Sequence, residues 1–192
     1  MPIVTALRER PRGRVEVHLD GAPWRLVPAD AVVRVGLVVG RAIDRETARS
    51  LGRELRRSEA VGAALRVLRY RDQSRRRLEQ RLTRRGIRAA AREDALEALE
   101  SAGFVDDARV ATARAQGLAE HGYGDAAIRF ALEAEGLAAE AVEEALAALE
   151  PEGDRARALL AARGDPRKGV RWLASKGFDA STLEDVAGFA DA

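Results

Sequence analysis

The chain has 192 residues, of which 46% are hydrophobic, 33% are charged and 4% are aromatic, and its net charge is only +2, as in a helical protein with a real core and much charged surface. It contains no cysteine, which excludes a disulfide framework and a thiolate metal site and favours the reducing cytosol. The apolar stretch Val32 to Val39 is much shorter than the ~20 residues of a membrane-spanning helix, and Met1-Pro2 opens no secretory signal, so we expect a cytoplasmic protein without a membrane partner.

The first 43 residues predict a β-hairpin. Apolar and polar residues alternate over 15–19, Asp20-Gly21 predicts a turn, and the alternation resumes over 24–26. Because a two-stranded hairpin is only marginally stable alone, we expect it to dock on the helices. The apolar run Val32 to Val39 would connect it to a helix that begins at Asp44.

From that point the chain repeats one helical module three times. Each copy is marked by a glycine followed by a large apolar residue, at Gly86-Ile87, Gly136-Leu137 and Gly177-Phe178. Such a glycine adopts the left-handed conformation that ends a helix, and the apolar residue packs back on that helix. The first two copies also correspond at Leu78, Leu82, Leu96 and Leu99 in the first and Ile128, Leu132, Leu146 and Leu149 in the second. The third copy is the weakest match, with Gly169 at a position where the others have Leu or Ile.

The first module begins with an apolar stripe at i, i+3, i+4 and i+7, formed by Val61, Ala64, Leu65 and Leu68. A second helix follows, with Ser74 as its N-cap and Gly86 at its end. A third helix is expected from about Ala90 to Ser101, closed by Gly103.

The second module predicts the same sequence of elements. Asp107, or its neighbour Asp106, caps a helix that ends near Gly122, and a shorter helix runs from about Asp125 to Glu135. The i, i+3, i+4, i+7 stripe then returns as Val142, Ala145, Leu146 and Leu149.

None of these modules could bury its apolar face alone, so neighbouring modules should pack on one another. We therefore expect a mainly α fold with three tandem three-helix, helix-turn-helix-like repeats in an elongated or crescent arrangement, preceded by the small hairpin. The expected divisions are 1–43 for the N-terminal segment, 44–103 for repeat 1 with its lead-in helix, 104–150 for repeat 2 and 151–192 for repeat 3.

The small net charge hides a large separation of charge along the chain. Arg53 to Arg92 contains fourteen arginines and four acids, a net charge of +10. Glu93 to Asp154 contains three arginines and sixteen acids, a net charge of −13. The first module is therefore basic and the second acidic.

Within the basic segment, Arg77, Arg81 and Arg84 recur at i, i+4 and i+7 on the helix that starts near Ser74. Such a stripe on a solvated face can follow the phosphates of a nucleic acid. The alternative is a plain surface bias, because Lys168 and Lys176 are the only lysines and a preference for arginine can come from genome base composition.

Asp106 and Asp107 are two adjacent carboxylates at the start of a helix, which in principle could bind a metal or do acid-base work. Helix capping and the favourable interaction with the helix dipole explain them more simply. His18 and His121 lie in unrelated elements, and the chain has no phosphate-cradling glycine loop. We therefore predict a protein that is not an enzyme and has no catalytic residue, metal or cofactor.

Several stretches closely resemble the RecX family of bacterial recombination regulators. They are Arg71-Asp72-Gln73-Ser74, the run GFVDDARVA from Gly103 and the run GYGDAAI from Gly122. The similarity extends from about Val15 to the C-terminus, and it implies short N-terminal strands before three tandem three-helix repeats. It also implies scaffold roles for Gly86, Gly103, Phe104, Gly122, Tyr123 and Gly124.

The resemblance implies a regulator that binds the RecA recombinase and its filament on single-stranded DNA, with weak affinity for DNA itself. Such a protein lowers the recombinase, ATPase and co-protease activities of RecA in DNA repair and the SOS response, and we expect a monomer. After Tyr123-Gly124 the family usually carries basic residues, whereas this chain has Asp125, Ala126 and Ala127. We therefore carry the basic role in partner and DNA binding onto the first repeat alone, at Arg71, Arg75, Arg77, Arg81, Arg84, Arg85 and Arg88.

Two other functions remain open. A sequence-nonspecific helix-turn-helix protein would place the helix from Ser74 to Gly86 in a DNA groove, where Gln80 could contact bases. A repeat scaffold for another charged partner is the second alternative. Tyr70 is the only aromatic residue in the basic segment, so direct DNA binding should be weak, salt-sensitive and indifferent to sequence.

Overall fold

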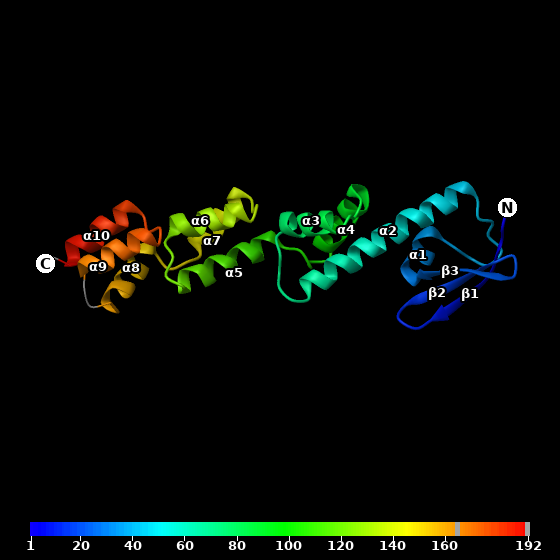
Figure 1. The fold of residues 1–192 in the computed structure, drawn as a ribbon, viewed down its shortest axis with the longest axis horizontal. Helices are drawn as coiled ribbons and strands as arrows, with labels where there is room; N and C mark the ends of the chain where they lie inside the picture. The colour runs from blue at the N-terminus through cyan, green and yellow to red at the C-terminus, as the bar shows by residue number, and fades with distance from the viewer. Residues whose placement is uncertain (164–165, 191–192) are drawn as a thin grey trace. The chain divides into compact units, whose positions relative to one another are not determined.

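The computed structural model describes residues 1–163 and 166–190, which form two compact units (Figure 1). The N-terminal unit consists of Met1–Arg71 and Glu79–Ala102, and the C-terminal unit of Asp72–Leu78 and Gly103–Ala192. The described fold is mainly helical with a small sheet at the N-terminus, as the sequence predicts.

The N-terminal sheet has three antiparallel strands in the order β1-β2-β3, with β1 at Val4–Arg10, β2 at Arg14–Leu19 and β3 at Ala22–Pro28. The predicted hairpin is β2 and β3, and its turn is confirmed by positive φ angles of 49° at Asp20 and 86° at Gly21. Strand β1 was not expected from the sequence. In this charged edge strand, Val4 is buried in the core and Leu7 packs partly against it. Two such residues do not form an alternation of apolar and polar residues long enough to predict a strand.

The segment expected to connect the hairpin to the helices is itself partly helical, which corrects that expectation. Helix α1 spans Ala29–Val35 and ends at Gly36, whose φ of 67° is left-handed. Valine is a weak helix former, so local propensity argues against this helix. Ala31, Val32 and Val35 lie buried against the sheet, and this tertiary contact outweighs the propensity.

Helix α2, Arg45–Leu68, contributes Leu51 to the core that the sheet and α1 form. Asp44 caps it as predicted, because its Oδ1 accepts a hydrogen bond from the Thr47 backbone N–H at 2.7 Å. Leu51 of α2 packs with Val17 and Val27 of the sheet and with α1. The predicted docking of the hairpin on the helices is confirmed.

The buried stripe in the second half of α2 is not the predicted one. Ala60, Ala63, Ala64 and Val67 are buried, whereas Leu65 is 37% exposed. Both sets have i, i+3, i+4, i+7 spacing, so periodicity alone could not choose between them. Ala60 packs against Ala91 and Ala95 of α4, Ala89–Ser101, so small side chains meet at this helix pair.

The remaining helices follow the predicted order. They are α3 at Arg75–Arg84, α5 at Asp107–Glu120, α6 at Asp125–Ala134, α7 at Ala139–Ala147, α8 at Glu152–Ala161, α9 at Pro166–Ser175 and α10 at Ala180–Ala190. Gly86, Gly136 and Gly177 have φ angles of 74°, 77° and 79°, so each repeat glycine ends its helix in the predicted left-handed conformation. Ser74 and Asp106 also act as the predicted N-caps of α3 and α5.

The C-terminal unit contains the same joint twice. At one joint Asp107 Oδ1, on the first residue of α5, accepts from the backbone N–H of Arg75, the first residue of α3, at 2.8 Å. At the other joint Glu152 Oε1, on the first residue of α8, accepts from the N–H of Asp125, the first residue of α6, at 2.6 Å. In each case the opening carboxylate of one helix satisfies an unpaired N–H at the start of another.

Glu152 holds the second joint with three hydrogen bonds. Besides the Asp125 N–H, it accepts from the Asp179 N–H at 3.1 Å and from the Thr182 hydroxyl at 2.8 Å, and the residue is buried. Glu152→Gln would replace one accepting oxygen by an NH₂ group that faces donors. We expect a loss of about 1–3 kcal/mol in the free energy of unfolding, measured by urea denaturation. Exposed Glu140→Gln should change this value by less than about 0.5 kcal/mol, and an equal effect of the two substitutions would contradict the assigned joint.

Asp125 adds a pH dependence to the same joint. Burial raises the pKa of its carboxyl above the ordinary value, while the ion pair with Arg155 opposes the shift and Glu152 adds to it. A raised pKa in the folded state gives stability at low pH that is lost as the pH rises through that pKa. Asp125→Asn, which does not titrate, should therefore gain stability relative to the unsubstituted chain as the pH rises above about 4. Urea denaturation at several pH values measures the difference, and a constant or reversed difference would contradict this origin.

Candidate nucleic-acid and protein interface

The second half of α3 and the turn that follows it form a basic surface on the N-terminal unit. We call its members, Arg81, Arg84, Arg85 and Arg88, the α3 basic face; all four are exposed. The opposite side of α3 is fixed by Leu82, which is fully buried. The helix and the turn after it therefore present these guanidinium groups to solvent.

Most of the charge on this face is unneutralised. Among the described residues, the side chains of Arg81, Arg84 and Arg88 have no hydrogen-bond or ion-pair partner, while Arg85 Nη1 donates to the Ala63 carbonyl at 3.4 Å. Exposed guanidinium groups without carboxylate partners remain available for phosphate oxygens. The face thus has the chemistry of a nucleic-acid contact.

The other three arginines of the predicted set have different surroundings. Arg71 is exposed in the loop before α3. Arg75 is half-buried, and its backbone N–H donates to Asp107. Arg77 is half-buried and pairs with Glu135 Oε1 at 3.3 Å, which corrects the expectation that it lies on a solvated face.

The pairing of Arg77 has a clear physical reason. The side chain of Glu135 is only 10% exposed, and Arg114 Nε approaches the same carboxylate oxygen at 3.5 Å. The Ser74 hydroxyl donates to the Glu135 carbonyl at 2.9 Å, which brings the start of α3 against this turn of the C-terminal unit. Charge reversal at Arg77 would place two carboxylates together there and disturb the fold.

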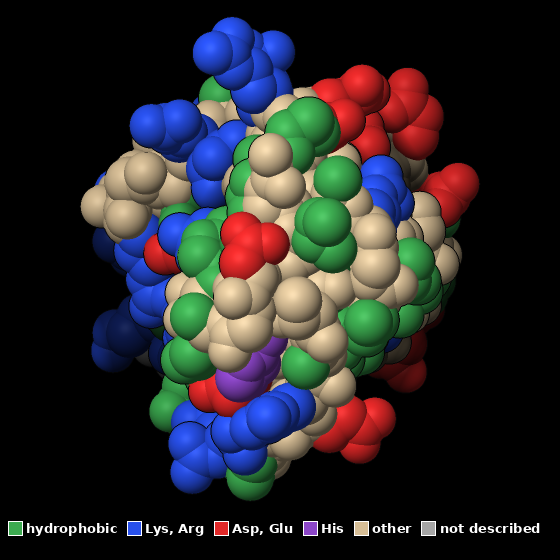
Figure 2. Space-filling model, turned by 90° about the vertical axis from the view of Figure 1, so that its right-hand side faces the viewer, with side chains coloured by type: hydrophobic (Ala, Val, Ile, Leu, Met, Phe, Trp, Pro, Cys, Tyr) green, Lys and Arg blue, Asp and Glu red, His purple; other side chains and the backbone are tan. Residues whose placement is uncertain are grey.

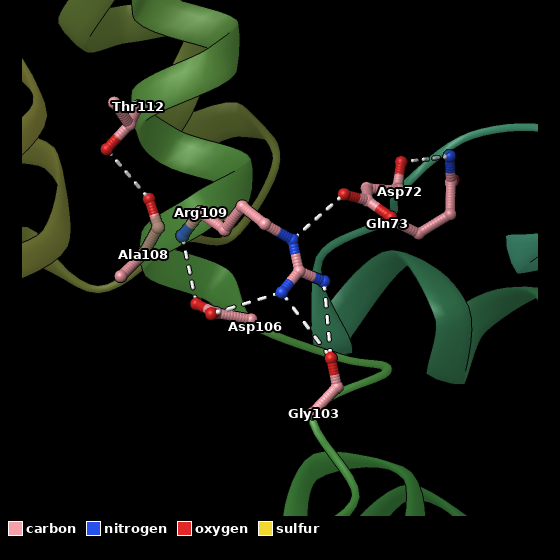
Figure 3. A network of polar contacts seen from close by, with 7 residues as sticks. All are labelled: Asp72, Gln73, Gly103, Asp106, Ala108, Arg109 and Thr112. Atoms are coloured by element: carbon pink, nitrogen blue, oxygen red, sulfur yellow. Dashed lines mark hydrogen bonds and ion pairs between the residues drawn. The ribbon is translucent and has the colours of Figure 1, made fainter.

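The Asp106-Asp107 pair performs the capping that the sequence favours. Asp106 Oδ1 accepts from the Arg109 N–H at 2.9 Å, and its Oδ2 lies 3.3 Å from the guanidinium of Arg109 (Figure 3). The same guanidinium contacts Asp72 Oδ2 at 3.1 Å and the Gly103 carbonyl at 3.4 Å. Figure 3 shows Arg109 reaching from α5 between these groups, so the two aspartates serve structure. In 1–163 and 166–190 we find no cluster of three His, Asp or Glu side chains that could hold a metal.

The C-terminal unit presents an acidic surface with exposed aromatic residues. Its exposed acids include Glu120, Glu133, Glu140, Glu143, Glu144 and Asp154. Phe130 of α6 is 74% exposed and Phe104 is 53% exposed. Phe130 was not recognised from the sequence, although it lies fifty residues after Gln80 on the equivalent helix, at a position that faces solvent.

Exposed apolar side chains also lie at the sheet end of the N-terminal unit. Figure 2 looks onto this end, where hydrophobic side chains form small patches and many Lys and Arg side chains gather along the left and lower margins. The exposed apolar residues of this unit include Trp24 and Leu26 of β3 and Val33 of α1. None of the described helices has the length and apolarity needed to span a bilayer.

Comparison with known proteins identifies the family. Residues 106–146 match the family model described as RecX, second three-helix domain. The chain is 34% identical over 156 residues to "Regulatory protein RecX" of Xanthomonas oryzae pv. oryzae (strain MAFF 311018), an alignment that covers 76% of this chain and 98% of the relative. The chain belongs to the RecX family of regulatory proteins.

A further relative agrees with this assignment, and two solved structures share the fold. "Regulatory protein RecX" of Stenotrophomonas maltophilia (strain R551-3) is 34% identical over 141 residues, covering 68% of this chain and 86% of the relative. The crystal structure of a regulatory protein RecX superposes with a TM-score of 0.85 at 20% identity, over 97% of this chain and 98% of that one. RecX from Lactobacillus salivarius gives a TM-score of 0.63 at 19% identity, over 71% of this chain and 97% of that one. The resemblance inferred from the sequence motifs and the expected helical-repeat fold are both confirmed.

Proposed function

We propose that this RecX-family chain binds the RecA recombinase and its filament on single-stranded DNA, and that it lowers the recombinase, ATPase and co-protease activities of RecA. Its role would lie in DNA repair and the SOS response in the cytoplasm, and it would act without a cofactor or chemical step of its own. Membership of a family of regulatory proteins is the observation that carries this proposal.

The distribution of charge supports separate surfaces for DNA and for protein. The α3 basic face suits the DNA backbone, because phosphate contacts by exposed arginines are electrostatic and independent of sequence. The acidic surface of the C-terminal unit suits a basic protein surface, with exposed Phe130 as an aromatic anchor. We place the protein contact on the C-terminal unit and the DNA contact on the α3 basic face.

Binding of the purified chain to immobilised single-stranded DNA, bare or coated with RecA and a non-hydrolysable ATP analogue, tests this proposal. We expect a monomer that binds the filament at least tenfold more tightly than bare DNA at the same salt concentration. Equal affinity for bare DNA and for the RecA filament would contradict a contact with RecA.

A second candidate function, sequence-nonspecific duplex binding, is favoured by one observation. Arg81 and Arg84 are exposed on α3, so this helix placed in a DNA groove would contact phosphates whatever the base sequence. Binding to duplex DNA that exceeds binding to the RecA filament would support this alternative.

A further inference from the structure

The N-terminal unit has a second basic site that involves none of the residues of the α3 basic face. A groove of about 490 Å³ lies between the turn that joins β1 to β2 and one face of α2. Arg12 lines it from the turn and Arg14 from the start of β2, and Arg66 lines it from α2 together with Ser58 and Glu59. All three arginines are exposed.

The turn holds Arg12 in an unusual backbone conformation. Its φ angle is 65°, in the left-handed region that glycine tolerates and arginine adopts at a cost of about 1–2 kcal/mol. Gly13 also has a φ of 65°, and its carbonyl accepts from the Ala29 N–H at 2.9 Å, which anchors the turn to the start of α1. A glycine at position 12 would satisfy the backbone better, so the presence of arginine indicates a use for the side chain.

A glycine that lines the groove leads to the same conclusion. Gly62 lies in the middle of α2, where glycine costs about 1 kcal/mol relative to alanine. A Cβ atom at this position would meet only Arg66 Nη1, at an ordinary 3.7 Å, so packing within the protein does not require glycine. The missing side chain leaves room for a ligand to approach the helix backbone.

The charges around the groove favour the binding of an anion. Three guanidinium groups face one carboxylate, that of Glu59, and within the described part of the chain the side chains of Arg12, Arg14 and Arg66 form no hydrogen bond or ion pair. Like charges gathered at one groove repel each other unless an anion neutralises them. Planar guanidinium groups match the geometry of phosphate oxygens.

We propose that this groove binds the phosphate backbone of a single-stranded nucleic acid and so gives the protein a DNA contact in addition to the α3 basic face. The inference rests on the proposed DNA contact of this chain, but it requires no RecA. It is therefore tested by binding of the chain to DNA in the absence of RecA.

The test compares two triple variants of the full chain that remove the same charge. Arg12→Gly/Arg14→Gln/Arg66→Gln removes the groove arginines, and Arg45→Gln/Arg49→Gln/Arg53→Gln removes three exposed arginines from α2 outside the groove. Binding to a labelled oligothymidylate is followed by fluorescence anisotropy at several salt concentrations. The groove variant should bind at least tenfold more weakly, with a salt slope smaller by about 0.7 for each phosphate that is no longer neutralised, whereas the control should stay within threefold.

Stability measurements separate this effect from misfolding. Arg12→Gly alone relieves the strained turn, so it should raise or preserve the unfolding midpoint while it weakens DNA binding. Groove and control variants of equal affinity would overturn the proposal. A second result would also overturn it: pyrophosphate raises the unfolding temperature only when the groove arginines are present, but the affinity for DNA does not depend on them. The ligand of the groove would then be a free phosphate compound. Neither outcome alters whether the unsubstituted chain binds the RecA filament, which tests the proposed function separately.

Discussion

Gly124→Ala is expected to destabilise the C-terminal unit by about 3 kcal/mol or more. A Cβ atom at Gly124 would lie 2.3 Å from the Gly177 carbonyl oxygen and 2.4 Å from the backbone N and Cα of Phe178. The Gly124 N–H also donates to the Lys176 carbonyl at 3.0 Å, so the two backbones are held at this distance. Because the clash is with backbone atoms, no rotation of a side chain can relieve it, and the start of α6 must separate from the turn after α9.

The unfolding free energy from urea denaturation measures this effect, and Gly86→Ala provides the matched control. Gly86 has a φ of 74°, but a Cβ there would meet no atom within 4 Å. This substitution should cost only the strain of a left-handed alanine, about 1–2 kcal/mol. If the two variants are destabilised equally, close backbone contact at Gly124 is not what selects glycine.

Arg81→Glu/Arg84→Glu is expected to lower the affinity for DNA and for the RecA filament about 100-fold or more. Both side chains are exposed on α3, and neither has a partner among the described residues, so their charges are free for phosphates. A hydrogen bond to a charged group contributes about 1.5–3 kcal/mol, and removing two such bonds corresponds to at least two powers of ten. Arg77 is left unchanged because its ion pair with Glu135 supports the fold.

Arg45→Glu/Arg49→Glu makes the same change of net charge at exposed positions of α2. Affinity for single-stranded DNA and for the filament is measured at one salt concentration, alongside the unfolding midpoint of each variant. A folded Arg81→Glu/Arg84→Glu variant that binds like this control would show that the α3 basic face is only a solvated surface.

Local signals in the sequence predicted most of the helical repeats. Asp44, Ser74 and Asp106 act as N-caps through contacts only three residues away, so capping rules could place them. The repeat glycines likewise mark helix ends through their own backbone conformation. Helix α1 and strand β1 escaped prediction because packing in the N-terminal core, rather than local propensity, stabilises them.

The site could be predicted less completely, because its surroundings come from residues distant in the chain. Helical spacing grouped Arg77 with Arg81 and Arg84, but the partner of Arg77 is Glu135, 58 positions away. The groove of Arg12, Arg14 and Arg66 brings a hairpin turn against α2, an arrangement with no periodic signal in the sequence. The expected repeat boundaries and the elongated or crescent arrangement of the repeats remain predictions.

The most direct test of the proposed function is the ATPase rate of RecA on single-stranded DNA as the chain is titrated in at fixed salt, with DNA in excess. We predict suppression at well below one copy of the chain per RecA. No effect across the titration, while the chain remains folded and monomeric, would contradict the proposed regulation of RecA.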